Sequence, residues 1–600
     1  MCRIAGIIDK DQNQAQIKQD VASMCKVMAH GGPDDEGIYE NAANHLVFGH
    51  RRLALIDLSI AGHQPMLYAD KFVISFNGEI YNYLILKKEL QNLGFEFYTH
   101  SDTEVILVGF ACWGISVFEK LKGMFAFALY DIDKKISYLV RDSAGIKPLY
   151  YSATNGQFVF ASEVKAFKKT AYQYPENPDW KVYFLAFGHI PEPYTTLADV
   201  VMLPKGSYLA WDHQSALMEI KCYAIKSEST TINNSHTATL LIKEALENSV
   251  SKHLIADAPI GVFLSGGIDS SIITLIADKE QQRLKQKLHT ISINFDKKKF
   301  SEEEYQNIVL ARIKCEHASY TLNEKIFSEL FPKAIAGMDQ PTNDGINSWF
   351  VNFYAKQNGL KAVLSGIGAD ELFGGYPSFK RIKIVKLLSA LPNYILRKSI
   401  NFRKQALKRA YYLSYGNTIG KYLFLRGSFT PDEIGKLLNL SINQVDKILQ
   451  QMNSSPIPKE LKLEEQASWL ELNLYMQNQL LKDTDAMSMQ HGVEVRLPFL
   501  DHDLTTLVKS INNNIKYKTG KPKGLLIDSF IDLLPRRIWD RPKMGFTFPF
   551  QYWLKENKSF QYKLAQCKNQ RGKELIQEFN NGKLHWSKVM AIYQVLTNEN

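Results

Sequence analysis

The hydrophobic pattern of this 600-residue chain changes character once, near residues 213–236. Up to about Trp211, short β-branched and aromatic runs alternate with turn residues, which favours a sheet-rich α+β domain. Residues 213–236 are polar and rich in Ser, Thr and Asn, as in a linker. Beyond them helical and strand patterns alternate, which is typical of an α/β domain with a parallel sheet, and the chain is mainly helical after Phe373. Because the chain is too long for one hydrophobic core, we expect two domains, 2–212 and 237–600.

Composition excludes several classes of protein. The longest apolar stretch, residues 105–118, has 14 residues, fewer than the ~20 that cross a bilayer. The N-terminus has no apolar run behind a basic start, so it does not resemble a signal peptide, and we expect a cytoplasmic protein. The six cysteines form no CxxC pair and no zinc-like spacing with histidine, which indicates neither a disulfide framework nor a structural metal.

Cys2 is the first candidate for chemistry. Methionine aminopeptidase removes Met1 when the next side chain is small, which would leave one residue with both a thiol and a free α-amino group. An α-amino pKa of ~7.7 to 8.0 lies near cellular pH, so the amine can take the thiol proton. Cys2 is therefore a candidate nucleophile that needs no separate histidine. Taken alone the signal is weak, because a small second residue is common by accident.

Three segments accompany Cys2: residues 49–57 (GHRRLALID), 77–82 (NGEIYN) and 101–104 (SDTE). Together they resemble the glutaminase domain of N-terminal-nucleophile amidotransferases, which implies an αββα sandwich. In that family such residues hold glutamine by its amino-acid end. The residues that the resemblance implies for glutamine binding and catalysis are Cys2, Arg52, Leu53, Asn77, Gly78, Glu79 and Asp102.

The charges of these residues suit glutamine. A guanidinium at Arg52 suits the substrate carboxylate, while Asp102 and the region of Glu79 suit its ammonium group. The side chain of Asn77 and the N–H of Gly78 can form an oxyanion hole. The alternative for Asn77-Gly78 is a hairpin turn between two strands.

A glycine-rich loop, residues 264–271 (LSGGIDSS), follows an apolar strand pattern and opens a helical one. The N–H groups and helix dipole of such a loop would point at a phosphate, although the lysine of a Walker A motif is missing. The loop resembles the pyrophosphate loop of ATP pyrophosphatases, which adenylate carboxylates and release pyrophosphate; the alternative is a plain strand-to-helix turn. The implied ATP contacts are Leu264, Ser265, Gly266, Gly267, Asp269, Ser270, Ile291, Ser365 and Gly366.

A second loop, residues 364–376 (LSGIGADELFGGY), resembles the SGxGxDExFGGY segment of the asparagine synthetase B family. Asp370 in this loop would join Asp269 in holding Mg²⁺ on the pyrophosphate. Lys543, within the stretch RPKMGF, occupies the place of a lysine that faces the acyl-adenylate and would stabilise charge as AMP leaves.

Two further segments, residues 483–489 (DTDAMSM) and 493–501 (VEVRLPFLD), match the same family, so the resemblance covers residues 2 to about 553. It implies ATP and Mg²⁺ as cofactors and glutamine and a carboxylate acceptor as substrates. It also implies two sites joined by an ammonia tunnel, and commonly a homodimer. A tunnel makes chemical sense because only neutral ammonia attacks an acyl-adenylate.

Three positions depart from the family pattern. Ile367 stands where asparagine-forming relatives carry a glutamate that is thought to assist ammonia attack. Gly31 replaces the arginine of the segment HRGPD, and Ile527 stands where relatives often carry arginine. None of these changes removes Cys2 or Asp269, so the expected reaction class stands.

The sequence leaves two acceptors open. Asparagine formation is the family's default, but isoleucine cannot move a proton, and general acid–base help is worth ~10²- to 10⁴-fold. Ile367 therefore predicts that free aspartate is a poor acceptor, with a uronic acid of a surface polysaccharide as the alternative. Other classes remain open: a lactam-forming or cyclase-type ligase, whose members usually lack the N-terminal cysteine, and a non-catalytic paralogue.

Residues 380–431 hold twelve Lys or Arg and no Asp or Glu, which exceeds the net charge of +10 of the whole chain. Apolar and aromatic residues interleave with these charges, which favours an amphipathic helical pair with a solvated basic face. The alternative is a surface that attracts an anionic sugar, lipid or membrane. Nucleic acid is not expected, since no stacking platform or recognition motif accompanies the charge.

Overall fold

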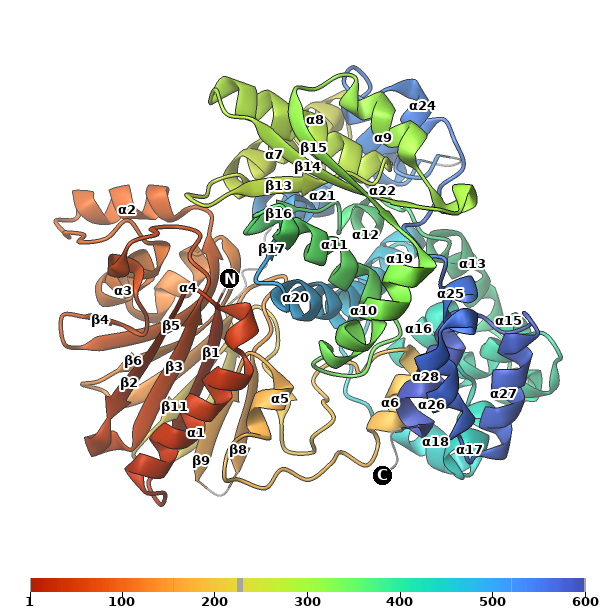
Figure 1. Cartoon of the computed structure of the whole chain (residues 1–600), viewed down its shortest axis with the longest axis horizontal. Coiled ribbons are helices and arrows are strands. Elements are labelled where there is room, and N and C mark those ends of the chain that lie inside the picture. The colour runs from red at the N-terminus through yellow and green to blue at the C-terminus, as the bar shows by residue number, and fades with distance from the viewer. Residues whose placement is uncertain (1, 155, 224–229, 519–520, 598–600) are drawn as a thin grey trace.

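The computed structural model describes residues 2–154, 156–223, 230–518 and 521–597. The N-terminal domain contains two antiparallel six-stranded sheets that face each other (Figure 1). In spatial order the first sheet consists of β10 (Val201–Met202), β8 (Tyr150–Thr154), β9 (Gln157–Ala161), β1 (Arg3–Ile8), β3 (Leu46–Arg52) and β2 (Asp35–Asn41). The second sheet consists of β12 (Leu217–Cys222), β11 (Ser207–Asp212), β7 (Ile136–Arg141), β6 (Gly123–Asp131), β5 (Phe72–Ile80) and β4 (Met66–Tyr68).

Strand β1 illustrates why the two sheets stack. Every residue of β1 is buried, and successive side chains point to opposite faces of a strand. Ile4 and Ile8 pack in the core between the sheets, whereas Ala5 and Ile7 pack outward under helix α1 (Gln14–Val27). Helices α2 (Tyr83–Asn92) and α3 (Asp102–Trp113) cover the outer face of the second sheet. The predicted αββα sandwich is confirmed.

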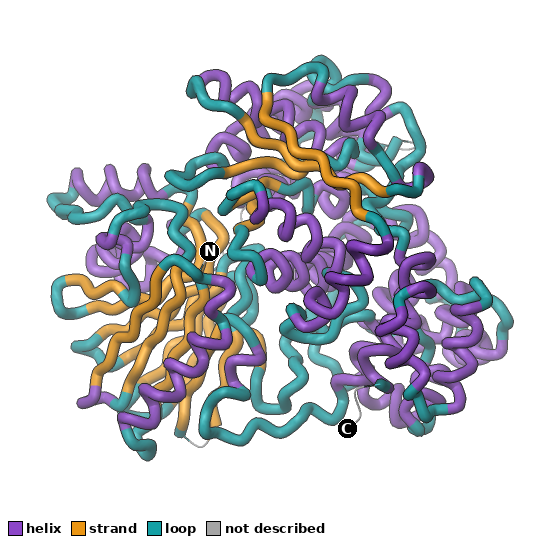
Figure 2. The backbone as a smooth tube through the Cα atoms, viewed as in Figure 1, coloured by secondary structure: helices purple, strands orange, loops and turns teal. Residues whose placement is uncertain are grey.

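The second domain is built on a five-stranded parallel sheet, drawn in orange at the top of Figure 2. Its spatial order is β15 (Cys315–Leu322), β14 (Leu288–Phe295), β13 (Ile260–Phe263), β16 (Ala362–Leu364) and β17 (Glu494–Arg496). Helices α7 (Ser235–His253) and α8 (Ile268–Arg283) share a core with β13. The two glycine-rich loops leave the carboxyl ends of neighbouring strands, β13 and β16, where open α/β sheets bind ligands. The predicted α/β fold is confirmed.

After Phe373 the chain is mainly helical, as expected, with β17 as an exception that completes the edge of the sheet. A large aromatic and aliphatic core joins most of these helices. They include α13 (Ser378–Leu388), α14 (Asn393–Lys398), α15 (Gln405–Lys408), α16 (Thr418–Arg426), α17 (Pro431–Leu438), α18 (Ile442–Gln450), α19 (Leu463–Leu470), α20 (Lys482–Met489), α21 (His502–Ser510), α23 (Gly524–Ser529), α25 (Phe550–Glu556), α26 (Lys558–Ala565), α27 (Gln570–Asn580) and α28 (Trp586–Leu596).

One helix of the N-terminal domain packs in the core of the second domain. Helix α6 (Trp180–Phe187) belongs by sequence to the first domain, yet its side chains are part of the helical core of the second. In Figure 1 this amber helix lies beside the blue helix α28. All but one of its eight residues are buried, so the helix lacks a polar face to turn toward solvent. The helix buries its apolar side chains in the large helical core of the second domain.

The region that we expect to be a linker, residues 213–236, contains more structure than predicted. Strand β12 pairs with β11 across its whole length, so the second sheet continues beyond residue 212. Residues 224–229 of the expected linker lie outside the described residues. Nowhere in the described part of the chain does a helix combine the length and the apolar character that crossing a bilayer requires.

Two candidate active sites

Cys2 lies at the start of β1, against the middle of β5. Its backbone N–H donates a hydrogen bond to Oδ1 of Asn77 at 3.1 Å, and its side chain is only 7% exposed. Nδ2 of Asn77 is buried and finds no hydrogen-bond partner among the described residues. A buried donor without an acceptor is costly, so this amide is ready to bind a substrate oxygen.

The hairpin-turn alternative for Asn77-Gly78 is wrong. Both residues lie inside β5, where they pair with Ala126 and Phe125 of β6. Gly78 has a φ of +155°, and a Cβ there would lie 2.2 Å from the carbonyl oxygen of Met124. Only glycine fits this close approach between the strands, so the segment is part of a strand and not a turn.

Burial raises the pKa of the Cys2 thiol. A backbone hydrogen bond from Leu53 and the charge of Arg52 act in the opposite direction without cancelling the effect of burial. At neutral pH the thiol therefore favours its protonated form, so attack by the sulfur would need a base to take that proton.

The predicted glutamine-binding residues converge from both sheets and from α3. The Arg52 guanidinium donates to the carbonyl of Ser59 at 2.9 Å and to that of Asp57, which fixes its position. Asp102, the first residue of α3, accepts a hydrogen bond from the Ile80 N–H at 2.9 Å. Burial raises the pKa of Asp102 to about 6. A cationic partner would stabilise the charged carboxylate against this cost of burial.

Glu79 lies differently from the other predicted residues. Its carboxylate is 3.2 Å from the guanidinium of Arg496, which belongs to β17 of the second domain. Arg496 also pairs with Glu494 at 2.6 Å, and its backbone carbonyl accepts a hydrogen bond from the Ser365 N–H at 2.9 Å. Glu79 is thus held by the other domain, and Arg496 joins the region of Cys2 to the second glycine-rich loop.

The first glycine-rich loop is closely tied to its neighbours. The Leu264 N–H donates to the carbonyl of Ile291 in β14 at 2.9 Å, and the hydroxyls of Ser265 and Ser270 are 3.0 Å apart. Gly267 precedes α8, whose 16 residues point their N-terminus at the loop. A Cβ on Gly366 would lie 2.8 Å from Cβ of Asp269, so the two loops touch.

Asp269 and Asp370 meet at a lysine that sequence reasoning missed. Nζ of Lys523 lies 2.5 Å from a carboxylate oxygen of each aspartate, and Nζ of Lys543 lies 2.7 Å from Asp370. Lys523 has a left-handed backbone, with a φ of +57°, just before α23. For a residue that is not glycine this conformation is uncommon and marks a candidate functional position, but it is visible only in the structure.

The charges of this cluster balance each other. Burial raises the pKa of Asp269, and the ammonium of Lys523 only partly opposes that effect. At Asp370, burial alone would raise the pKa, but Lys523 and Lys543 outweigh burial and lower it. Two carboxylates thus face two ammonium groups at the mouth of the first loop, ready to exchange partners with a charged ligand.

Two of the three positions that depart from the family pattern, Ile527 and Ile367, lie in the second domain. Ile527 is buried one turn after Lys523, and its N–H donates to the Lys523 carbonyl at 2.9 Å. Ile367 is partly buried against an apolar cluster between the domains. The cluster includes Met124 and Ile146 of the first domain and Val495 and Leu497 of the second. The second loop therefore meets an apolar region that reaches the first domain.

Both halves of the chain match known protein families. Residues 241–583 match the family model described as "Asparagine synthase", and residues 1–223 match that of a glutamine amidotransferase domain. Asparagine synthetase [glutamine-hydrolyzing] 1 of Bacillus subtilis is 31% identical over 92% of this chain and 88% of its own. Asparagine synthetase B [glutamine-hydrolyzing] of Escherichia coli is 31% identical over 65% of this chain and 67% of its own. A putative asparagine synthetase of Mycobacterium bovis is 29% identical over 93% of this chain.

The fold and the two sites define an ATP-dependent carbon–nitrogen ligase that takes its nitrogen from glutamine. One domain matches a glutamine amidotransferase domain, and the other matches asparagine synthase. The chain belongs to the asparagine synthase family.

Proposed function

We propose that the acceptor is the side-chain carboxylate of aspartate, so that the chain makes asparagine. The names of its relatives support this acceptor, and they favour neither a uronic acid nor a lactam-forming reaction. The observation that carries the coupled reaction is the pair of sites itself. A buried thiol beside a free amide donor lies in one domain, two aspartates with two lysines lie in the other, and Arg496 contacts both regions.

In the glutaminase site we propose that Cys2, once processed, attacks the side-chain amide carbon of glutamine. Its α-amino group takes the thiol proton, and Nδ2 of Asn77 with the Gly78 N–H stabilises the oxyanion. The proton passes to the leaving nitrogen, ammonia departs and water hydrolyses the thioester. Arg52 and Asp102 hold the amino-acid end, and Glu79 acts through Arg496.

In the synthetase site the acceptor carboxylate attacks the α-phosphorus of ATP, and pyrophosphate leaves. Ammonia then displaces AMP from the acyl-adenylate. We propose that Leu264, Ser265, Gly266, Gly267 and Ser270 cradle the phosphates, with Ile291, Ser365 and Gly366 beside the nucleotide. Lys523 and Lys543 move from the aspartates onto phosphate oxygens as these bind.

Asp269 and Asp370 fit Mg²⁺. Among the described residues no three His, Cys, Asp or Glu side chains are grouped to hold a metal, so a cage made by the protein alone is not offered. Mg²⁺ is commonly held by one or two carboxylates together with substrate phosphates, which is the donor set that these two aspartates and ATP provide. When bound, the ion would neutralise charge on the departing pyrophosphate.

The apolar cluster around Ile367 suits the passage of neutral ammonia. Its members from both domains are Met124, Ile146, Ile291, Ala355, Leu360, Val363, Met476, Leu481, Val493, Val495, Leu497 and Leu500. Apolar side chains offer no acceptor that would hold an ammonium ion, and they exclude the water that would protonate ammonia. We propose that the tunnel follows this cluster.

Replacing Ile367 by glutamate is expected to raise asparagine formation from aspartate roughly 10- to 100-fold, because a carboxylate can take the proton of the attacking ammonia. The measurement is steady-state asparagine formation at fixed ATP and glutamine, with a nucleotide-linked uronate as the comparison acceptor. Ile367→Gln is the matched control, since glutamine has the same shape without a titratable proton.

Equal rates for the glutamate and glutamine variants would contradict a proton-transfer role at position 367. If the unmodified chain amidates the uronate and not aspartate, the proposed acceptor is wrong while the reaction class stands.

A cytoplasmic location and a homodimer remain part of the proposal, as does contact with an anionic membrane surface through residues 380–431. Exposed apolar side chains interleave with the cations of α13, α14 and the turns after them, with Leu387 at 73% and Tyr394 at 64% exposure. Four cations of residues 380–431 pair with carboxylates: Lys383 with Glu464, Arg397 with Asp446, Lys408 with Asp432 and Arg426 with Glu471. A solvated basic face alone does not explain the exposed Leu387 and Tyr394, whereas an anionic bilayer would accept both kinds of side chain.

We therefore expect the full chain to sediment with phosphatidylglycerol vesicles, and not with phosphatidylcholine vesicles. Binding should fall steeply with salt, since the attraction is screened within ~10 Å at 0.1 M. Leu387→Glu should weaken binding about tenfold, because it removes the expected apolar contact with the bilayer and adds a repelled charge. The control is Tyr562→Glu, since Tyr562 is also 73% exposed but lies on α26. Equal loss in both variants would contradict a defined docking face.

A further inference from the structure

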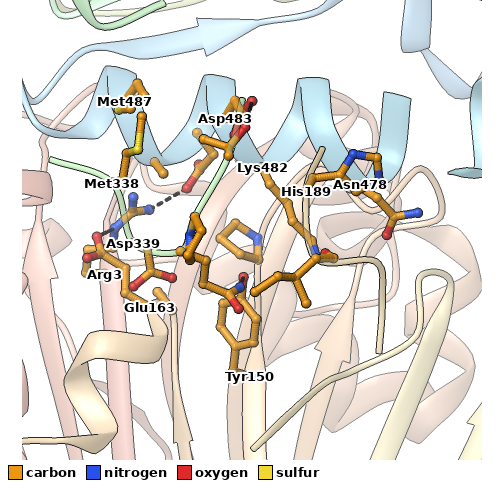
Figure 3. Close-up of a pocket in the computed structure, with 18 residues that line it drawn as sticks. Arg3, Tyr150, Glu163, His189, Met338, Asp339, Asn478, Lys482, Asp483 and Met487 are labelled. Atoms are coloured by element: carbon orange, nitrogen blue, oxygen red, sulfur yellow. Dashed lines mark hydrogen bonds and ion pairs between the residues drawn. The ribbon is translucent and has the colours of Figure 1, made fainter. Parts of the chain in front are cut away.

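Arg3, the residue after the nucleophile, is completely buried between the two domains. Its Nε lies 2.6 Å from Oε1 of Glu163, in the loop between β9 and α5 (Val164–Phe167), and its Nη1 lies 2.9 Å from Oδ2 of Asp485. Asp485 belongs to helix α20 of the second domain. Figure 3 shows Arg3 reaching from β1 toward this helix, close to Glu163 and Asp339.

The charge of Arg3 is firmly held in this position. Burial alone would lower the pKa of the guanidinium, but Asp485 and Glu163 outweigh burial and raise it. Nζ of Lys147 lies 3.7 Å from Asp485, and Nε2 of His30 lies 3.0 Å from Glu163. A buried ion group of this kind is demanding in geometry, so it specifies one arrangement of the elements that contribute to it.

The space that Arg3 occupies depends on Gly31. A Cβ on Gly31 would lie 2.8 Å from Cγ of Arg3 and 3.0 Å from its Nε. A side chain at position 31 and the observed course of Arg3 therefore exclude each other. This chain has glycine at position 31 and arginine at position 3, and the absent side chain leaves room for the present one.

We propose that Arg3 positions α20 against the glutaminase site. Helix α20 packs on β17, and the Arg496 carbonyl of β17 holds the Ser365 N–H at 2.9 Å. Arg3, which follows Cys2 in the chain, is thereby linked through α20 and β17 to the loop of the second site. Its role is to keep the two sites in register, so that ammonia released by Cys2 reaches the adenylate.

The test is the amount of amide formed per glutamine hydrolysed, which rests on the proposed function because an amide product is measured. Arg3→Ala should lower this ratio roughly 3- to 30-fold. Ammonia-dependent amide formation should stay within about twofold of the parent, since the second site itself is intact. The double variant Arg3→Ala/Gly31→Arg should recover most of the ratio, because the second arginine reaches the same carboxylates from the other side.

Gly31→Ala gives a second route to the same answer without removing a charge. One methyl group against Cγ of Arg3 should displace the guanidinium and lower the ratio in the same direction as Arg3→Ala. This variant decides the matter if Arg3→Ala does not fold.

The proposal is overturned if the ratio is unchanged in Arg3→Ala and Gly31→Ala, or if the double variant is no better than Arg3→Ala. Should the parent form no amide even with ammonia, the proposed acceptor has failed, and thermal unfolding of the full chain still tests Arg3. The parent and the double variant should then unfold in one transition, and Arg3→Ala in two separate ones. Identical unfolding of all three would equally overturn it.

Discussion

Replacing Cys2 by alanine is expected to lower glutamine hydrolysis by roughly four orders of magnitude or more while ammonia-dependent amide formation continues. The backbone of Cys2 is hydrogen-bonded to Asn77, whose Nδ2 has no partner among the described residues, and without the Cys2 thiol no thioester can form. The second site draws on ammonia from any source. The measurement compares glutamate release from glutamine with amide formation from ammonium chloride at the same ATP and acceptor concentrations.

Cys25→Ala is the matched control, since Cys25 is another buried thiol of the same domain. Burial raises the pKa of Cys25 to about 12, so it stays a thiol and offers no nucleophile at neutral pH. We expect this variant to hydrolyse glutamine at nearly the parental rate. Hydrolysis that survives in Cys2→Ala would show that a different residue attacks glutamine.

Replacing Asp269 by asparagine is expected to reduce acceptor-dependent pyrophosphate release by roughly 10²- to 10³-fold. The substitution removes one of the two carboxylates that meet at Lys523, and with it a proposed Mg²⁺ contact. Lys523 keeps Asp370 as a partner, so the variant should fold. Glutamine hydrolysis should continue, and ammonia should be released without amide formation.

Asp278→Asn serves as the control because Asp278 lies on the same helix, α8, well beyond its first turns. Its hydrogen bonds go to Gln282 and to the Lys314 N–H, away from the loop, so pyrophosphate release should be unaffected. Nucleotide products give a second check on the mechanism. ADP and phosphate in place of AMP and pyrophosphate would rule out adenylation.

Sequence patterns predicted the parts of both sites that are local in the chain. The loop before α8 could be identified because a strand, a glycine-rich turn and a helix follow each other within a few residues. Asn77-Gly78 was ambiguous between turn and site, since the same dipeptide serves both, and only its pairing inside β5 decided the question. The helix α6 was assigned to the domain that precedes it in sequence, because an all-apolar helix carries no signal of which core receives it.

The sequence by itself determined the two domains, their order and the residue types of the chemistry, because periodicity and short motifs are local properties. Tertiary structure alone decided which charges meet. Lys523 pairs with Asp269 from 254 residues away, Glu79 is held by Arg496 of the other domain, and Arg3 fits only because Gly31 has no side chain. The partner of a buried ion depends on the space and the charges around it in the folded chain. Residues that are neighbours in sequence therefore do not predict which buried charges will pair.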